Sequence, residues 1–175
     1  HNYIQHNIIT GLDKSGIGIE YAMAEAFAIS GDLVVKNNLI DGNWNTSSVG
    51  LSVDAAKTLT VDGNIFMRLN VPLQLLKYHD TKLVSLVQSN SNIYDNKVVI
   101  IADRYSTTTK LFDSLAKWNA VQSGSLKTVA TNSPDSKSLT VNSDFLFDDV
   151  VRYKYNIKSP ALNFLGIGKS AGPYE

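Results

Sequence analysis

The feature that most constrains the fold of this chain is a short phrase, an asparagine followed by two apolar residues, that recurs at intervals. It occurs at Asn7, Asn38, Asn64 and Asn92, so the spacings are 31, 26 and 28 residues. A self-similar period of roughly 20–50 residues is the mark of a stacked repeat protein. One repeat cannot bury its apolar face alone, so neighbouring repeats stack to form a common core.

Short stretches in which apolar and polar residues alternate flank each phrase, which is the pattern of β-strands. Each unit therefore consists of a strand, a turn, a short strand, a loop and a further strand. We predict an all-β fold, a right-handed parallel β-helix whose stacked turns occupy residues 1–105. The predicted strands after the phrase are residues 16–19, 50–53, 72–75 and 97–101, and those before it are 32–35, 58–61 and 82–87.

In such a solenoid the recurring asparagine would lie at one corner of each turn. Its amide could then bond the amide of the asparagine ~4.8 Å away in the next turn. Asparagine also tolerates the left-handed backbone of a tight corner. The alternative is an ordinary β-sandwich, in which the recurrence is an accident of an Asn-rich chain.

The pattern changes from about Ser106, and we assign residues 106–175 to the last turn or turns, an amphipathic helix and a C-terminal cap of the same domain. Apolar residues at near-helical spacing predict the helix over residues 110–121. Another strand is expected at residues 138–141. The aromatic tail beyond it would cover the apolar edge of the last turn.

Composition narrows the function classes. The chain has 175 residues with 16 basic and 16 acidic side chains and no Lys/Arg-rich run, so it lacks the footprint of nucleic-acid binding. It has no polybasic membrane patch and no apolar stretch near the ~20 residues that span a bilayer. Cysteine is absent, which excludes disulfides and thiolate chemistry. From the predicted fold we expect a secreted, periplasmic or cell-surface protein.

The first predicted turn starts directly at His1, with no capping segment before it. The apolar edge of this turn would be bare, and bare strand edges pair readily with other chains. We therefore expect a partner at the first turn, either an N-terminal β-helix chain or further copies of this chain.

A family resemblance rests on the repeats NIIT, GIGIE, LVVKNNLI, GLSV and KTLTVDGNIF, which resemble the pectate-lyase-like superfamily of right-handed β-helices. The C-terminal part is similar to the ends of carbohydrate-active members, with a helix containing Trp118, a D-x-x-S-L strand at 135–139, DFLF at 144–147, SPAL at 159–162 and a closing AGPYE. The resemblance implies the C-terminal part of a secreted polysaccharide-acting enzyme, a glycoside hydrolase or a polysaccharide lyase. The alternative is a non-catalytic carbohydrate-binding, adhesion or filament-type module, because a fold does not fix a function.

Two carboxylates could form a catalytic pair. Glu20 and Asp54 each directly follow an apolar strand, in adjacent turns. Pointing outward in one column, their carboxyl groups would lie ~5 Å apart, near the ~5–5.5 Å of a retaining glycosidase pair. The same oxygens could bind calcium, a hard cation. The alternative to both is a pair of solvated carboxylates at strand ends.

A second candidate cluster lies on the loop after residues 75–76. Polysaccharide lyases use Lys, Arg, His or Tyr as the base that removes a proton beside a sugar carboxylate. Lys77 and His79 are therefore candidate catalytic residues, and Arg68 and Tyr78 are candidate substrate-binding residues. The alternative is an exposed polar loop.

Aromatic rings in expected loops could stack on sugars, because they combine an apolar face with a polar tip. Tyr21 and Trp44 are candidates of this kind besides Tyr78, whereas Trp118 is expected to pack on the solenoid. His1 could chelate copper through its amine and ring if a second histidine lay opposite, but we interpret His6 as a turn or face residue. We expect either no cofactor or calcium.

Overall fold

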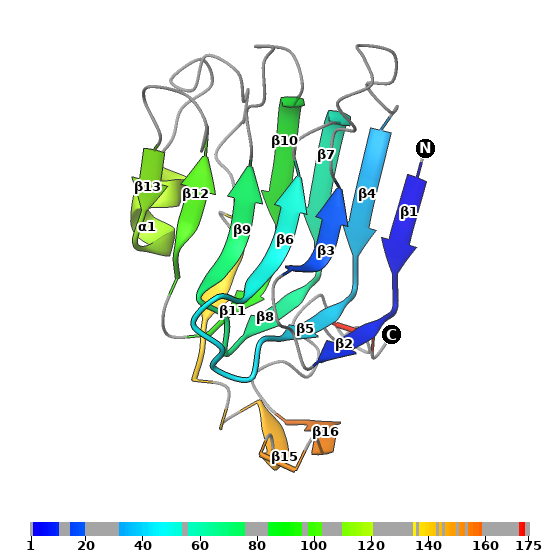
Figure 1. Ribbon diagram of the computed structural model, residues 1–175, viewed down its shortest axis with the longest axis vertical. Helices are drawn as coiled ribbons and strands as arrows, with labels where there is room; N and C mark the ends of the chain where they lie inside the picture. Colours follow the sequence, from blue (N-terminus) through cyan, green and yellow to red (C-terminus); the bar gives the residue numbers. More distant parts are fainter. Residues whose placement is uncertain are drawn as a thin grey trace.

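The structure is a computed structural model that describes residues 2–10, 15–19, 32–53, 56–75, 84–95, 98–102, 110–120, 135, 137–142, 144, 146–149, 151–152, 154–158 and 172–173. Most of its strands lie in three sheets, A, B and C (Figure 1). Sheet A contains β1 (Asn2–Gln5), β4 (Asp32–Lys36), β7 (Ala56–Asp62) and β10 (Val84–Asn90). Sheet B contains β2 (Ile8–Thr10), β5 (Leu39–Asp41), β8 (Ile65–Met67), β11 (Ile93–Tyr94) and β14 (Leu139–Thr140). Sheet C contains β3 (Ser15–Ile19), β6 (Val49–Val53), β9 (Val71–Leu75), β12 (Ile100–Ala102) and β13 (Lys110–Phe112).

Successive passages of the chain build the three sheets together. From β1 to β12 the chain contributes a strand to sheet A, then to B, then to C, and returns to A beside its earlier strand (Figure 1). Neighbouring strands within these sheets run parallel, except that β13 is antiparallel to β12. The predicted all-β class is confirmed. The alternative of a β-sandwich is wrong for the described strands, because a sandwich is made of antiparallel sheets.

The recurring asparagines form a ladder at the corner between sheets A and B. The Asn38 side-chain amide donates to Asn64 Oδ1 at 3.0 Å, and the Asn64 amide donates to Asn92 Oδ1 at 3.1 Å. The Asn7 amide donates to Asn38 Oδ1 in the same way. These predicted contacts are confirmed, but the left-handed backbone lies one residue earlier than predicted. It occurs at His6, Asn37, Gly63 and Ser91, with φ angles of 58°, 53°, 67° and 55°, which confirms His6 as a turn residue.

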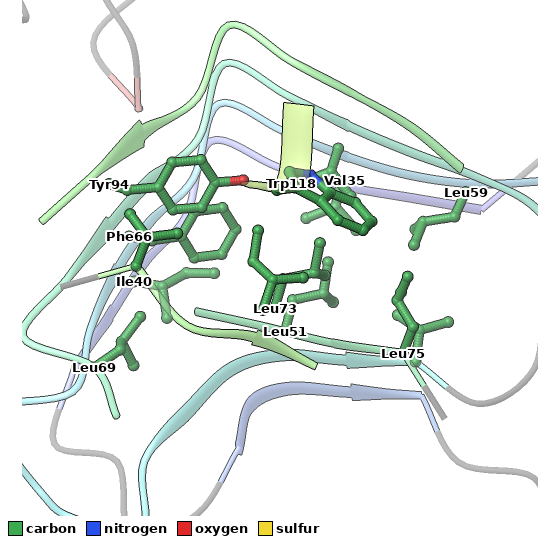
Figure 2. Close-up of a cluster of buried hydrophobic side chains, with 14 of the residues drawn as sticks. Val35, Ile40, Leu51, Leu59, Phe66, Leu69, Leu73, Leu75, Tyr94 and Trp118 are labelled. Atoms are coloured by element: carbon green, nitrogen blue, oxygen red, sulfur yellow. The ribbon is translucent and has the colours of Figure 1, made fainter. Parts of the chain in front are cut away.

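Inward side chains from the three sheets meet in one apolar core (Figure 2). Because the strands are parallel and in register, residues of similar size repeat from strand to strand at ~4.8 Å. In sheet B, the rings of Phe66 and Tyr94 stack with centroids 5.3 Å apart and planes inclined by 10°. The labelled core residues are Val35 and Leu59 from sheet A, Ile40, Phe66 and Tyr94 from sheet B, Leu51, Leu73 and Leu75 from sheet C, together with Leu69 and Trp118.

The segment predicted to be helical over residues 110–121 is only partly so. Its first residues form β13, and helix α1 spans Leu115–Asn119. The Ser114 hydroxyl accepts a hydrogen bond from the Lys117 backbone N–H and begins the helix. Trp118 is fully buried in the core, which confirms its predicted packing role. No helix in the described ranges is long and apolar enough to cross a membrane.

The described part of the tail covers the outer face of sheet B. There β15 (Phe147–Asp149) and β16 (Lys154–Ile157) form an antiparallel pair (Figure 1). Phe147 joins an apolar cluster with outward residues of sheet B, including Leu39 and Ile65. Its ring meets that of Tyr155 edge-on, with centroids 5.5 Å apart. These residues cover the outer face of sheet B. We expected the tail to cover the edge of the last turn instead.

The asparagine ladder ends on a buried carboxylate, Asp135, whose φ is 59°. The Asn92 amide donates to Asp135 Oδ1 at 2.9 Å, and the Asn92 backbone N–H donates to Ser138 Oγ at 2.7 Å. Asp135 and Ser138 together therefore replace the next asparagine of the ladder. The other donors to the carboxylate are Ser89 Oγ at 2.6 Å, Tyr94 OH at 3.1 Å, Trp118 Nε1 at 2.7 Å and Ser138 Oγ at 2.6 Å.

The burial of Tyr94 makes stability depend on alkaline pH. Burial raises the pKa of the Tyr94 phenol well above its usual 10.0, and the charge of Asp135 adds to the rise. Above about pH 10 the unfolded chain therefore loses this proton while the folded chain keeps it. The free energy of unfolding should then fall by ~1.4 kcal/mol per pH unit from this group alone. Urea unfolding measured on both sides of pH 10 checks this, with the slope reduced in Tyr94→Phe but not in a Tyr3→Phe control. Equal slopes in the two variants would contradict it.

Candidate functional site

The outer face of sheet A carries a groove of about 620 Å³. This volume falls within the ~300–1,000 Å³ of sites that bind small molecules. Along β4 the outward residues alternate with Leu33 and Val35, which are buried in the core. The groove is lined by Tyr3, Gln5, Asp32, Val34, Lys36, Thr58, Thr60 and Gln88.

Parallel register arranges these side chains in rows across the sheet. The central row consists of Tyr3, Val34, Thr60 and Gln88, which are register partners on four neighbouring strands. Tyr3 is 62% exposed and presents its ring to solvent. Val34 and the methyl group of Thr60 continue the apolar surface, with one side chain per strand at ~4.8 Å.

Polar and charged side chains lie on both sides of the central row. On one side, the Thr58 hydroxyl donates a hydrogen bond to Asp32 Oδ1. On the other side, Gln5, Lys36 and Asp62 are register partners. Lys36 Nζ lies 3.4 Å from Asp62 Oδ2, and the two side chains are 40% and 37% exposed. An ion pair this exposed contributes little to stability, so its main effect is on the charge that a ligand meets.

The groove therefore offers an apolar strip bordered by hydroxyl, amide and charged groups. That arrangement suits a flat ring with apolar faces and a polar rim. Asp32 and Asp62 belong to rows four residues apart along the strands, which is roughly 13 Å. Paired carboxylates of glycosidases lie roughly 5–9.5 Å apart. These two carboxylates can take part in binding but are too far apart to cleave a glycosidic bond as a pair.

Most of the residues predicted to form a site lie outside the described residues, and so does His1. These predicted site residues belong to the three segments that join sheet C to sheet A, after β3, β6 and β9. Ile19 and Val53, the strand residues just before two of them, are register partners. The predicted residues in these segments are Glu20, Tyr21, Asp54, Lys77, Tyr78 and His79.

Two predicted substrate-binding residues are described, and neither lines the groove. Arg68 is 3% exposed, and its guanidinium donates two hydrogen bonds to the carboxylate of the buried Asp41. The Tyr155 hydroxyl donates to the same carboxylate at 2.6 Å. Trp44 is 61% exposed at the corner between β5 and β6, with a φ of 61°, and its backbone N–H donates to the Arg68 carbonyl at 2.9 Å.

Burial and charge shape the ionisation of this cluster. Burial lowers the pKa of Arg68, but the hydrogen bonds and charge of Asp41 outweigh it, so the net shift is upward. Burial raises the pKa of Tyr155, and its hydrogen bond to Asp41 raises it further. Arg68 therefore stays a cation and Tyr155 a neutral donor, both directed at one carboxylate. Such a closed cluster holds β16 against sheet B.

The groove residues Tyr3, Asp32, Lys36 and Gln88 were not among the sequence-predicted site residues. The signal that could have found them is the alternation of the sheet A strands. In DLVVK, for example, the inward Leu33 and Val35 leave Asp32, Val34 and Lys36 on the outer face. Stacking the strands by the asparagine register would have collected these outward residues into rows.

Neither a metal-ligand cluster among the described residues nor a match to a known protein points to a further functional site. No group of three or more His, Asp or Glu side chains that could hold a metal ion occurs among the described residues. Comparison of the chain with protein-family models, with curated proteins and with solved structures finds no match.

Proposed function

We propose that the chain is part of a right-handed parallel β-helix that binds a polysaccharide or oligosaccharide across the outer face of sheet A. Two features support the fold: the fixed order in which the chain visits three parallel sheets, and the asparagine ladder at one corner. The handedness follows a general rule, because crossovers between parallel strands of one sheet are right-handed in ~98% of cases.

The observation that carries the binding function is the central row, an apolar strip that begins at the exposed ring of Tyr3 and is bordered by polar side chains. Sugar rings have apolar faces and hydroxyl rims, and aromatic rings with polar neighbours suit both. A glycan lying along the row would cross one strand every ~4.8 Å. The resemblance to carbohydrate-active β-helices supports the same class of ligand and a secreted or cell-surface protein.

Replacing Tyr3 by alanine tests this site. We expect the affinity for a bound glycan to fall roughly tenfold, because the largest exposed apolar surface of the groove is lost. Titration calorimetry against a panel of polysaccharides measures the change. The matched control is Leu111→Ala on β13, since Leu111 and Tyr3 are both 62% exposed. Equal losses in the two variants would contradict the proposal, and a loss in Trp44→Ala alone would move the site to that corner.

A glycoside hydrolase or polysaccharide lyase is a second candidate function, favoured by where its candidate residues fall in the chain. The segments with Glu20, Asp54, Lys77 and His79 lead directly into β4, β7 and β10. The groove residue Asp32 is the first residue of β4. Cleavage would then occur at this end of the groove, with or without calcium. Loss of polysaccharide cleavage in Glu20→Gln and Asp54→Asn, with binding retained, would support the hydrolase; release of unsaturated sugars that depends on Lys77 or His79 would support the lyase.

We propose that the edge formed by β1, β2 and β3 pairs with a further coil, which is one more three-strand turn of the β-helix from another chain. At the inner rungs, an asparagine Oδ1 accepts the backbone N–H and the amide of the asparagine one coil earlier. A parallel coil with an asparagine at this corner could bind Asn7 Oδ1 in the same way, and its strand would lie beside the outward Ile8, which is 51% exposed. Native mass spectrometry tests this: a co-purifying β-helix chain supports it, multiples of 19.2 kDa indicate self-assembly, and a 19.2 kDa monomer contradicts both.

A further inference from the structure

The asparagine ladder has a direction, so its two ends differ in hydrogen-bonding capacity. At each rung the backbone N–H and the side-chain amide donate towards the next coil, where one asparagine Oδ1 accepts both. The donors of Asn7 are all in use: its backbone N–H and amide donate to Asn38 Oδ1, and its amide also donates to the Gln5 carbonyl. No donor among the described residues reaches Asn7 Oδ1. This end of the ladder therefore offers an acceptor and needs donors from its partner.

The other end of the ladder has no such donors to offer. Ser138 occupies the ladder position of the last coil, because the residues that follow the two positions, Ile93 and Leu139, are register partners. The Ser138 backbone N–H donates to the Asp135 carbonyl at 2.9 Å, and its hydroxyl donates to Asp135 Oδ1 at 2.6 Å. Both donors are thus directed back into their own coil. A copy of this chain stacked by its C-terminal end would leave Asn7 Oδ1 without a donor.

Strand direction at the same end also opposes head-to-tail stacking of copies. Strand β14 runs parallel to β11, whereas β13 runs antiparallel to β12. In a copy stacked in the same orientation, β2 would pair parallel with β14, but β3 would pair antiparallel with β13. The described strands at this end therefore do not present the all-parallel edge on which each inner coil is built.

A two-fold pair of copies fails at the same atom. Such a pair brings one surface against the identical surface of the partner. With the two ladders in line, the Asn7 Oδ1 of one copy would face the Asn7 Oδ1 of the other. Two acceptors without a donor cannot form a hydrogen bond.

We infer that the partner at this edge is not a second copy of this chain but a different β-helix chain, whose last coil carries an asparagine with free donors at the ladder corner. The inference rests on the proposed pairing of this edge with a further coil. In the ladder the residue after the asparagine lies outward and the next lies inward, as Ile8 and Ile9 do. The last coil of the partner should therefore repeat the phrase of an asparagine followed by two apolar residues.

An inner coil of this chain provides a probe of known sequence. Leu33 is the register partner of both Asn2 and Leu59. A copy of residues 33–57 placed directly before His1 therefore adds one coil in register. In this extended protein the asparagine copied from Asn38 has free donors and faces Asn7 Oδ1. We expect the extended protein to have a higher Tm than the original chain.

Substitutions in the copied coil alone connect the gain to the ladder. Asn38→Asp keeps the shape and replaces the amide donor by an acceptor, so it should lower the Tm of the extended protein by about 5 °C. Asn43→Asp is the matched control, since it makes the same charge change at an exposed asparagine. The loss from Asn38→Asp should shrink when Asn7→Ala removes the acceptor, because the two groups then no longer interact.

The outcomes separate the inference from the proposed pairing. A gain in Tm that depends on the copied asparagine and on Asn7, and a different β-helix chain in native mass spectrometry, support the inference. A gain that Asn38→Asp leaves unchanged overturns the inference, although the edge still accepts a coil. Multiples of 19.2 kDa overturn it as well, since copies then suffice as partners. If the added coil gives no gain, both the pairing and the inference are wrong.

Discussion

Replacing Asp135 by alanine should lower the free energy of unfolding by about 3–5 kcal/mol, a loss that single substitutions rarely exceed. The carboxylate is fully buried and accepts hydrogen bonds from five side chains at the end of the asparagine ladder. Without it these donors lose their acceptor in a place closed to bulk water. Each buried donor left unpaired costs about 1–3 kcal/mol, but hydroxyl groups can rotate towards other acceptors, so the costs do not simply add.

Asp135→Asn keeps the shape and should still cost about 2 kcal/mol. The amide nitrogen of the new side chain must replace one of the two oxygens. At the Oδ1 position it would face the Asn92 amide, and at the Oδ2 position it would face the indole N–H of Trp118. Neither of these groups can become an acceptor by rotating a hydroxyl. One donor is therefore directed at another donor in either orientation.

Urea unfolding followed by tryptophan fluorescence and circular dichroism measures both variants. Asp113→Ala is the control, since Asp113 is 58% exposed and pairs with Lys117 at the surface. Surface changes of this kind usually stay within about 0.5 kcal/mol. An Asp135→Ala protein within 1 kcal/mol of the wild type would mean that the carboxylate does not hold the end of the ladder.

The regular part of the fold could be predicted because each coil repeats the same chemistry. Leu33 and Leu59 are register partners, and each lies five residues before a ladder asparagine. Val87 pairs with Leu59 and lies five residues before Asn92, although the segment before it fits the repeat less well. The end of the ladder could not be predicted in this way. Asp135 comes 43 residues after Asn92, beyond a segment without the repeat and with a different residue type.

The candidate site was missed for a related reason. The sequence-based predictions concern expected loops and strand ends, whereas the groove consists of the outward residues of strands whose inward residues set the register. Arg68 illustrates the opposite case. Its residue type suggested substrate binding, but its partner Asp41 lies 27 residues earlier in the chain, and Tyr155 lies 114 residues after Asp41. Only the stacking of coils and the return of the tail bring these three side chains together.

Arg68→Met should lower the free energy of unfolding by about 3–5 kcal/mol, because it leaves a buried carboxylate without its counter-charge. Asp41 is fully buried, and Arg68 Nε donates to its Oδ1 at 2.8 Å. In the variant the charge would keep two donors, the Tyr155 hydroxyl at 2.6 Å and the Asn43 backbone N–H at 2.9 Å. Those two neutral groups cannot replace a cation. Lys117→Met is the control, since it removes a cation from a partner that is exposed.

Adding Asp41→Asn to Arg68→Met should recover about 1–2 kcal/mol, although Asp41→Asn alone should also be destabilising. The single change leaves a guanidinium buried without a counter-charge, whereas the double change removes both charges. The remaining amide oxygen can still accept from Tyr155 or from the Asn43 backbone. A double-mutant cycle by urea unfolding measures this recovery. Costs that add would instead mean that Asp41 and Arg68 act independently, and that packing rather than charge holds β16 on sheet B.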